Sequence, residues 1–131
     1  MGHRILVVDD DAAVRTLLVD VLRDAGFSVS AIRLAEEAPD VLRVTPPDLI
    51  VLDLGMPSGT MQGMDFLATL REMEAWKGLP VVILSAYGDV VNRDITTRLL
   101  ATVLAKPLRD IEILPRTIHE LLGARGGERA D

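Results

Sequence analysis

The stretch RILVVDDDAAVRTLL, residues 4–18, decides the class of fold. Its apolar block at residues 5–8 ends in three consecutive carboxylates, Asp9, Asp10 and Asp11, and apolar residues then recur at helical spacing. This pattern predicts a short buried strand that leads directly into an amphipathic helix. Acidic residues at a helix start cap the backbone and complement the helix dipole. Three adjacent carboxylates also repel one another, and their burial costs free energy unless a partner elsewhere in the chain compensates.

The remainder of the chain repeats this alternation of short apolar blocks and helical patterns. We predict strands at residues 5–8, 27–32, 48–53, 80–85 and 102–105. We predict helices at residues 12–25, 35–44, 64–76, 89–100 and 110–122. Gly26 stands where a helix C-terminus favours a left-handed residue, and Pro39 either delays the start of its helix or kinks it. Five strands that alternate with five helices predict an α/β fold, with helices on both faces of a parallel sheet.

The composition bounds the class of protein. The chain has 131 residues, a hydrophobic content of 49% and no cysteine, which suits one domain and excludes disulfides and cysteine catalysis. No apolar run approaches the roughly 18 residues of a membrane span, and the start lacks the apolar core of a signal peptide. The net charge of −6 argues against direct binding to nucleic acid. We therefore expect a cytoplasmic domain at residues 1–122, with no membrane or nucleic-acid partner, and a flexible polar tail at residues 123–131.

Polar residues that could carry chemistry follow four of the predicted strands. Asp9 and Asp10 follow the first predicted strand. Asp53 stands at the end of the third strand, Ser85 at the end of the fourth and Lys106 at the end of the fifth. The carboxyl ends of parallel strands form the ligand-binding edge of such sheets, so these side chains should converge. Mg²⁺ neutralises close carboxylates and pairs with phosphate, while an ammonium and a hydroxyl bind an anion. Each residue alone is better explained as a cap or a turn, but their joint placement predicts a carboxylate that accepts a phosphoryl group.

Four pieces of the sequence resemble the receiver domain of two-component response regulators. They are ILVVDDD, PDLIVLDLGMP, PVVILSA and AKP, and they occur in the order and at the spacing of that family. The resemblance covers residues 4–122, which is nearly the whole chain. It implies a flavodoxin-like, doubly wound sheet of five parallel strands in the order 2-1-3-4-5.

The resemblance also implies a role for each acidic residue. Asp53 would accept a phosphoryl group from the phosphohistidine of a sensor histidine kinase or a phosphotransfer protein. Asp10 and Asp53 would bind Mg²⁺ through their carboxylates, Gly55 through its carbonyl oxygen, and Asp9 through water. Asp11 is then left as the cap of the following helix.

Ser85 and Lys106 would contact the phosphoryl group, and the Lys106–Pro107 peptide bond would be cis. The resemblance implies that the chain is a signalling module and not an enzyme that acts on other substrates. It would catalyse only its own phosphorylation and dephosphorylation, and it would switch the surface that it presents to a downstream protein or output domain.

Several positions depart from the family pattern. The loop at residues 57–63 is two residues longer than usual, and Val103 stands where the family usually has Tyr or Phe. Leu99 and Leu100 replace a usual Gly-Ala pair. We therefore expect signal transmission through this face to differ. Tyr87 either lies over the phosphoryl group, where it would slow hydrolysis, or packs on the neighbouring helix.

Two other classes of function stay open at this point. A metal-dependent phosphohydrolase would use the same aspartyl-phosphate, although such enzymes often need a second acid where Gly55 stands. A scaffold without phosphorylation would not need the acids, the hydroxyl and the lysine together. His3 and His119 are isolated, and Trp76 is interpreted as a packing residue. Nine tail residues cannot hold an output domain, so the chain is either a stand-alone regulator or a piece of a longer one.

Overall fold

The computed structural model of the chain is an α/β fold built on one parallel sheet. It describes residues 3–33, 37–53, 66–85, 101–105 and 111–130, and their side chains except at 85, 105 and 124–130. The strands are β1 (Arg4–Val8), β2 (Ser28–Ile32), β3 (Leu49–Asp53), β4 (Val81–Ser85) and β5 (Ala101–Ala105). All neighbouring strands pair in parallel, in the order β2-β1-β3-β4-β5. The predicted fold class and strand order are confirmed.

The helices flank these strands in the alternation that the sequence predicts. They are α1 (Ala12–Asp24), α2 (Ala38–Val44) and α5 (Ile113–Ala130), and residues 66–72 are also helical. Pro39 lies in the first turn of α2 and Pro115 in the first turn of α5, where the backbone N–H groups have no intrahelical acceptor. The late start of α2 is therefore the correct explanation of Pro39. The helix predicted at residues 89–100 lies outside the described residues.

Two helices differ in length from the prediction. The helix predicted at residues 64–76 ends at residue 72 and continues as turns, where Nη1 of Arg71 donates to the Trp76 carbonyl at 3.1 Å. Helix α5 continues past residue 122 to Ala130. No proline interrupts residues 116–130, but Gly123, Gly126 and Gly127 disfavour helix, so local propensity does not explain this extension. The division of the chain into a domain and a tail at residue 122 stays a prediction. None of the described helices is long and apolar enough to cross a membrane.

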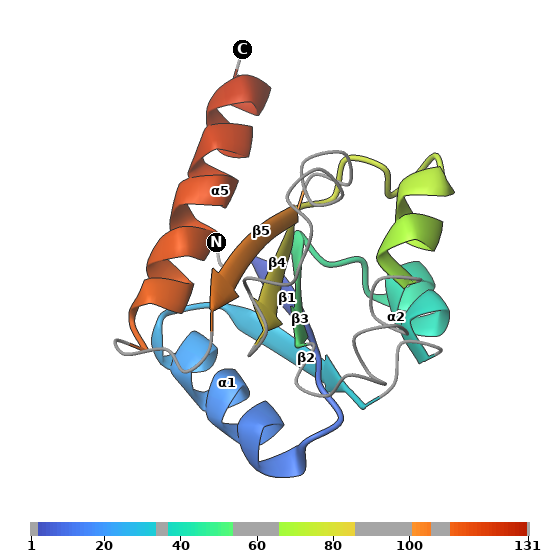
Figure 1. The fold of residues 1–131 in the computed structure, drawn as a ribbon. Helices are drawn as coiled ribbons and strands as arrows, with labels where there is room; N and C mark the ends of the chain where they lie inside the picture. Colours follow the sequence, from blue (N-terminus) through green and yellow to red (C-terminus); the bar gives the residue numbers. More distant parts are fainter. Residues whose placement is uncertain (1–2, 34–36, 54–65, 86–100, 106–110, 131) are drawn as a thin grey trace.

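Helices cover both faces of the sheet. Figure 1 shows α1 and α5 on one side of the strands, and α2 with the helical residues 66–72 on the other. Because successive strand residues point to opposite faces, the central strands bury both rows of side chains. Val7 and Val51 belong to the core on the α1 and α5 side, whereas Val8 and Leu52 belong to the core on the α2 side. This double burial explains why the strands appear in the sequence as continuous apolar blocks.

Local signals set both ends of α1. Oδ1 of Asp11 accepts hydrogen bonds from the backbone N–H groups of Ala13 and Val14, at 2.9 and 3.1 Å, which caps the first turn. Gly26 follows the helix with a φ of 99°, a conformation that side chains disfavour, and its N–H donates to the Arg23 carbonyl at 3.0 Å. Both predictions made for this helix are confirmed, and β1 is joined to α1 by only the acidic residues 9–11.

Candidate functional site

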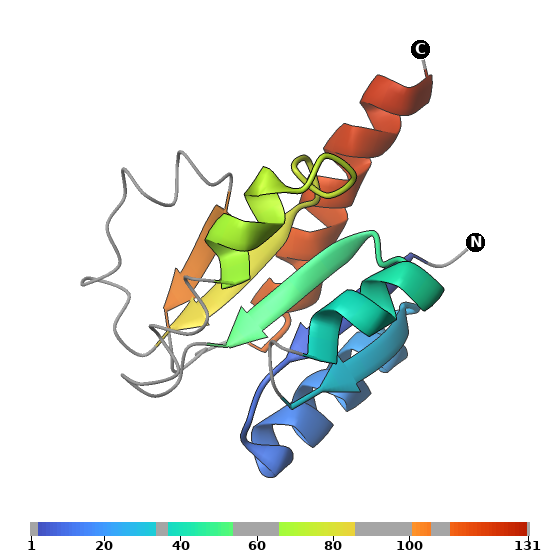
Figure 2. The ribbon, with the colours of Figure 1, turned by 90° about the vertical axis from the view of Figure 1, so that its right-hand side faces the viewer.

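The register of the sheet brings two predicted site residues together. Figure 2 shows the arrowheads of the strands directed toward the same edge. Val8 lies opposite Leu52 in the parallel pairing of β1 with β3. The next residues, Asp9 and Asp53, are therefore neighbours on adjacent strands, which are spaced roughly 4.8 Å apart.

The start of α1 holds Asp9 in place. Asp9 is only 3% exposed, and its Oδ1 accepts a hydrogen bond from the backbone N–H of Asp11 at 2.9 Å. The Oδ2 atoms of both Asp9 and Asp53 are buried, whereas the side chain of Asp10 is exposed. Burial of a carboxylate oxygen costs free energy unless donors or a cation lie nearby. This edge of the sheet is therefore an environment that favours positive charge.

The few carboxylates at this edge of the sheet are suitable ligands for Mg²⁺. Within the ranges that the structure describes, no three His, Cys, Asp or Glu side chains gather closely enough to hold a metal ion. Mg²⁺ does not require such a cluster, since it binds through one or two carboxylates and keeps several of its waters. Asp9 and Asp53 supply carboxylate oxygens, one of them buried in each residue, and Asp10 supplies a solvent-exposed one.

The remaining predicted residues are placed only in part. Ser85 ends β4, and its backbone lies opposite Ala105 at the same edge of the sheet as Asp53. The other predicted positions lie outside the described residues: Gly55, Lys106, Pro107, Tyr87, Leu99, Leu100 and the loop at 57–63. The structure thus brings Asp9, Asp53 and the backbone of Ser85 to a common edge.

The structure also describes three other residues that the sequence analysis singled out: Val103, Trp76 and His119. Val103 lies opposite Ile83 in the sheet and is partly buried against the core on the α2 side. Trp76 packs against the same core, so its interpretation as a packing residue is confirmed. The ring of His119 lies on that of Phe27, with centroids 4.7 Å apart.

Arg15 is a site residue that the sequence interpretation missed. Its Nη1 donates to the backbone carbonyl of Asp9 at 2.8 Å, so a guanidinium lies beside the acidic end of β1. Arg15 stands four residues after the cap Asp11, and that spacing turns a helical side chain back toward the helix start. A basic residue at this spacing, directly after a strand that ends in acids, was the signal that could have identified it.

The Asp11→Ala variant is expected to lose about 1 kcal/mol of unfolding free energy, because two N–H groups of α1 lose their acceptor. Its Mg²⁺ affinity should equal that of the wild type, since this carboxylate serves the helix. Urea denaturation and titration calorimetry measure the two quantities. Asp11→Asn keeps an acceptor oxygen and is the matched control. Weaker Mg²⁺ binding by both Asp11→Ala and Asp11→Asn would place the Asp11 carboxylate in the metal site.

A doubly wound sheet in this strand order, with acids at the ends of its first and third strands, defines the receiver class of signalling domain. The chain belongs to the response regulator receiver domain family, whose model matches residues 5–117. The family resemblance drawn from the four sequence pieces is thereby confirmed. Receiver domains are phosphoacceptors of two-component signalling and generally depend on Mg²⁺.

Particular proteins resemble the chain to different extents. The DNA-binding response regulator MtrA of Mycobacterium tuberculosis (strain ATCC 25618 / H37Rv) is 42% identical over 92 residues, which cover 70% of this chain and 38% of MtrA. A putative response regulator from Chloroflexus aurantiacus J-10-fl superposes with a TM-score of 0.81 at 30% identity, covering 94% of this chain and 99% of the other. Chemotaxis protein CheY4 of Vibrio cholerae superposes with a TM-score of 0.79 at 26% identity, covering 92% and 98%. The chain thus spans less than half the length of MtrA.

Proposed function

We propose that Asp53 is the phosphoacceptor of this receiver domain and that a sensor histidine kinase or a phosphotransfer protein is the donor. The observation that carries the proposal is the position of Asp53, a partly buried carboxylate at the end of β3 in the register position beside Asp9. The strand order reverses between β1 and β3, because β2 lies outside β1 and the later strands lie on the other side. Ligands of doubly wound sheets bind at this switch point.

The proposed metal ligands are the carboxylates of Asp10 and Asp53 and the carbonyl of Gly55, with Asp9 acting through water. Mg²⁺ bound at these oxygens would neutralise part of the charge on the phosphoryl group. Asp9 is suited to contact the metal ion through water, because its Oδ1 already accepts a hydrogen bond from the backbone N–H of Asp11. Arg15 supports the same arrangement, since its hydrogen bond fixes the backbone that carries Asp9 and Asp10.

The proposed reaction moves a phosphoryl group from one protein side chain to another. A carboxylate oxygen of Asp53 attacks phosphorus, a P–O bond forms as the P–N bond of the phosphohistidine breaks, and the imidazole leaves with the electron pair. Ser85 is proposed to donate to a phosphoryl oxygen, and the Lys106 ammonium is proposed to pair with the phosphoryl charge. That added charge, about −1.5 to −2, is the signal that shifts the surface of the domain.

The proposal extends to the partners and the location of the chain. It assigns the chain to the cytoplasm, where its downstream partner is a protein or an output domain. The net charge of −6 disfavours contact of this domain itself with nucleic acid. The chain turns over no substrate other than its own phosphoryl group.

Labelling by a small phosphodonor tests this function. With Mg²⁺ and acetyl phosphate, the wild-type chain is expected to gain one phosphoryl group, as measured by intact-protein mass spectrometry. Chelation of Mg²⁺ should prevent the labelling. The same protein should release phosphate from p-nitrophenyl phosphate at the background rate. Steady release would identify a metal-dependent phosphohydrolase and would contradict the proposal.

Replacement of Asp10 by Ala is expected to weaken Mg²⁺ binding by at least about tenfold, because even indirect partners of a metal site contribute about 10–100-fold. Titration calorimetry with MgCl₂ measures the affinity. Asp20→Ala is the matched control, since Asp20 is an exposed acid of α1. Equal Mg²⁺ affinity of Asp10→Ala and wild type would move the metal site elsewhere.

A further inference from the structure

The outer edge of β2 presents backbone hydrogen-bonding groups to solvent. The Ser28 N–H donates to His3 and the Ile32 carbonyl accepts from Asp9, so these two residues face β1. The backbone N–H and C=O groups of successive residues in a strand point to opposite sides. Those of Val29 and Ala31 therefore point away from β1, toward the open edge. Among the described residues no strand pairs with this edge; the Val29 carbonyl accepts a hydrogen bond from Nη2 of Arg23 at 3.4 Å.

The side chains of β2 do not protect this edge. Its sequence is SVSAI, which contains no charge and no proline, the two features that most often block edge pairing. Ser28, Ser30 and Ala31 are exposed. An uncharged edge strand of this kind is a template for strand addition.

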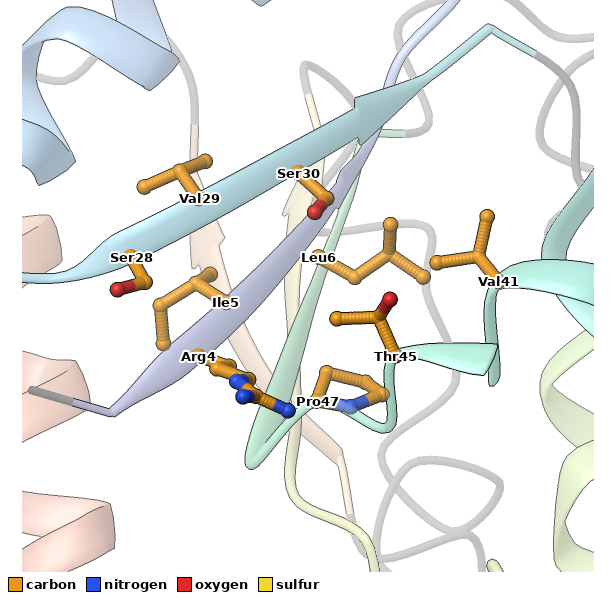
Figure 3. A pocket seen from close by; sticks show the side chains of 9 residues that line it. All are labelled: Arg4, Ile5, Leu6, Ser28, Val29, Ser30, Val41, Thr45 and Pro47. Atoms are coloured by element: carbon orange, nitrogen blue, oxygen red, sulfur yellow. The ribbon is translucent and has the colours of Figure 1, made fainter. Parts of the chain in front are cut away.

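A groove lies beside the same edge, on the face of the sheet that α2 covers. Its cavity volume is about 90 Å³, and it is lined by Arg4, Leu6, Ser28 and Ser30 from the strands and by Val41 and Thr45 from α2 and its C-terminal end. Figure 3 shows Leu6 and Val41 pointing toward each other across this groove, with Ser30 and Thr45 beside them. The two serines of β2 contribute only short side chains to this lining.

Of the residues that line the groove, Arg4 alone carries a charge. Arg4 is exposed, and within the described part of the chain its guanidinium forms no ion pair. The nearby Asp48 carboxylate accepts the backbone N–H of Arg4 at 2.8 Å. Arg23 adds a second guanidinium at the outer edge of β2. An acidic side chain of a bound segment that lay over Ser28 would therefore be close to the guanidinium of Arg4.

We propose that this edge and groove bind an extended acidic segment of a partner protein, which adds to β2 as a further strand. Backbone bonds to the Val29 N–H and to the N–H and carbonyl of Ala31 would supply affinity, and an acidic side chain paired with Arg4 would supply selectivity. A second copy of the chain offers no such complement, because its β2 carries no acid. Five strand steps of about 3.3 Å separate Arg4 from Asp9, so this site lies roughly 16 Å from the phosphoacceptor edge.

The test uses a labelled peptide of alternating glutamate and valine, blocked at both ends and matched in length to β2. Fluorescence anisotropy is expected to show binding of this peptide, at least about tenfold weaker binding by Arg4→Glu, and no change with Lys77→Glu, an exposed charge reversal outside the groove. A lysine-valine peptide should bind more weakly than the glutamate-valine peptide. Equal affinity for the two peptides would overturn the proposal.

Backbone pairing is tested separately. Ala31→Pro removes an outward N–H that no strand of the sheet uses. The variant should therefore fold but no longer bind the glutamate-valine peptide. An N-methylated form of the peptide tests the same bonds on unaltered protein and should not bind. Binding of the N-methylated peptide as tight as that of the parent would overturn the proposal, as would a concentration-dependent dimer that Ala31→Pro abolishes. Arg4→Glu should still be labelled by acetyl phosphate, which separates this site from the phosphoacceptor.

Discussion

The Asp53→Asn variant is expected to accept no phosphoryl group from acetyl phosphate in the presence of Mg²⁺. The carboxylate of Asp53 is the proposed nucleophile, and an amide of the same shape lacks the charge that attacks phosphorus. The variant keeps the size of the side chain at the end of β3, so the sheet around it should be unchanged. Intact-protein mass spectrometry after incubation measures the label, and circular dichroism checks the fold.

Asp48→Asn is the matched control for this experiment. Asp48 directly precedes β3, at the opposite end of that strand from Asp53, and its Oδ2 accepts the backbone N–H of Arg4. The amide oxygen of Asn can keep that bond, and the variant should be labelled as fully as the wild type. Stoichiometric label on Asp53→Asn would show that another residue is the phosphoacceptor. The metal and phosphoryl contacts proposed around Asp53 would then also be wrong.

The Leu22→Ala variant is expected to lose about 2–5 kcal/mol of unfolding free energy, the range for leucine truncation in a packed core. Leu22 is fully buried in the core between α1 and the sheet, with an exposed fraction of 0%. Leucine and alanine are both good helix formers, so the loss reports packing rather than helix propensity. Urea denaturation monitored by circular dichroism measures it.

Leu17→Ala in the same helix is the control, because Leu17 is 52% exposed. Its unfolding free energy should stay within about 0.5 kcal/mol of the wild type. Equal losses in the two variants would mean that α1 does not turn the Leu22 face toward the sheet. The assignment of this helix to the α5 side of the sheet would then be contradicted.

The amino-acid pattern alone determined those features that depend on near neighbours in the chain. The apolar blocks that became β1, β3 and β4 indicated strands buried on both faces, because only such strands need no polar row. Asp11 and Gly26 marked the two ends of α1 through cap chemistry that involves residues a few positions away. The four motif pieces pointed to the receiver family, and with it to the strand order and to Asp53.

Only the tertiary structure decided features that depend on residues distant in sequence. The pairing of Val8 with Leu52 sets Asp9 beside Asp53, and a strand pattern by itself does not specify register between strands. The same holds for Arg15 on the Asp9 carbonyl and for the groove where Arg4 meets Ser28 and Thr45. The lengths of the helix at residues 66–72 and of α5 also differed from prediction, since helix ends depend on competing local propensities of about 1 kcal/mol or less per residue. Long-range packing selects one register and one set of contacts from the many that the local sequence permits.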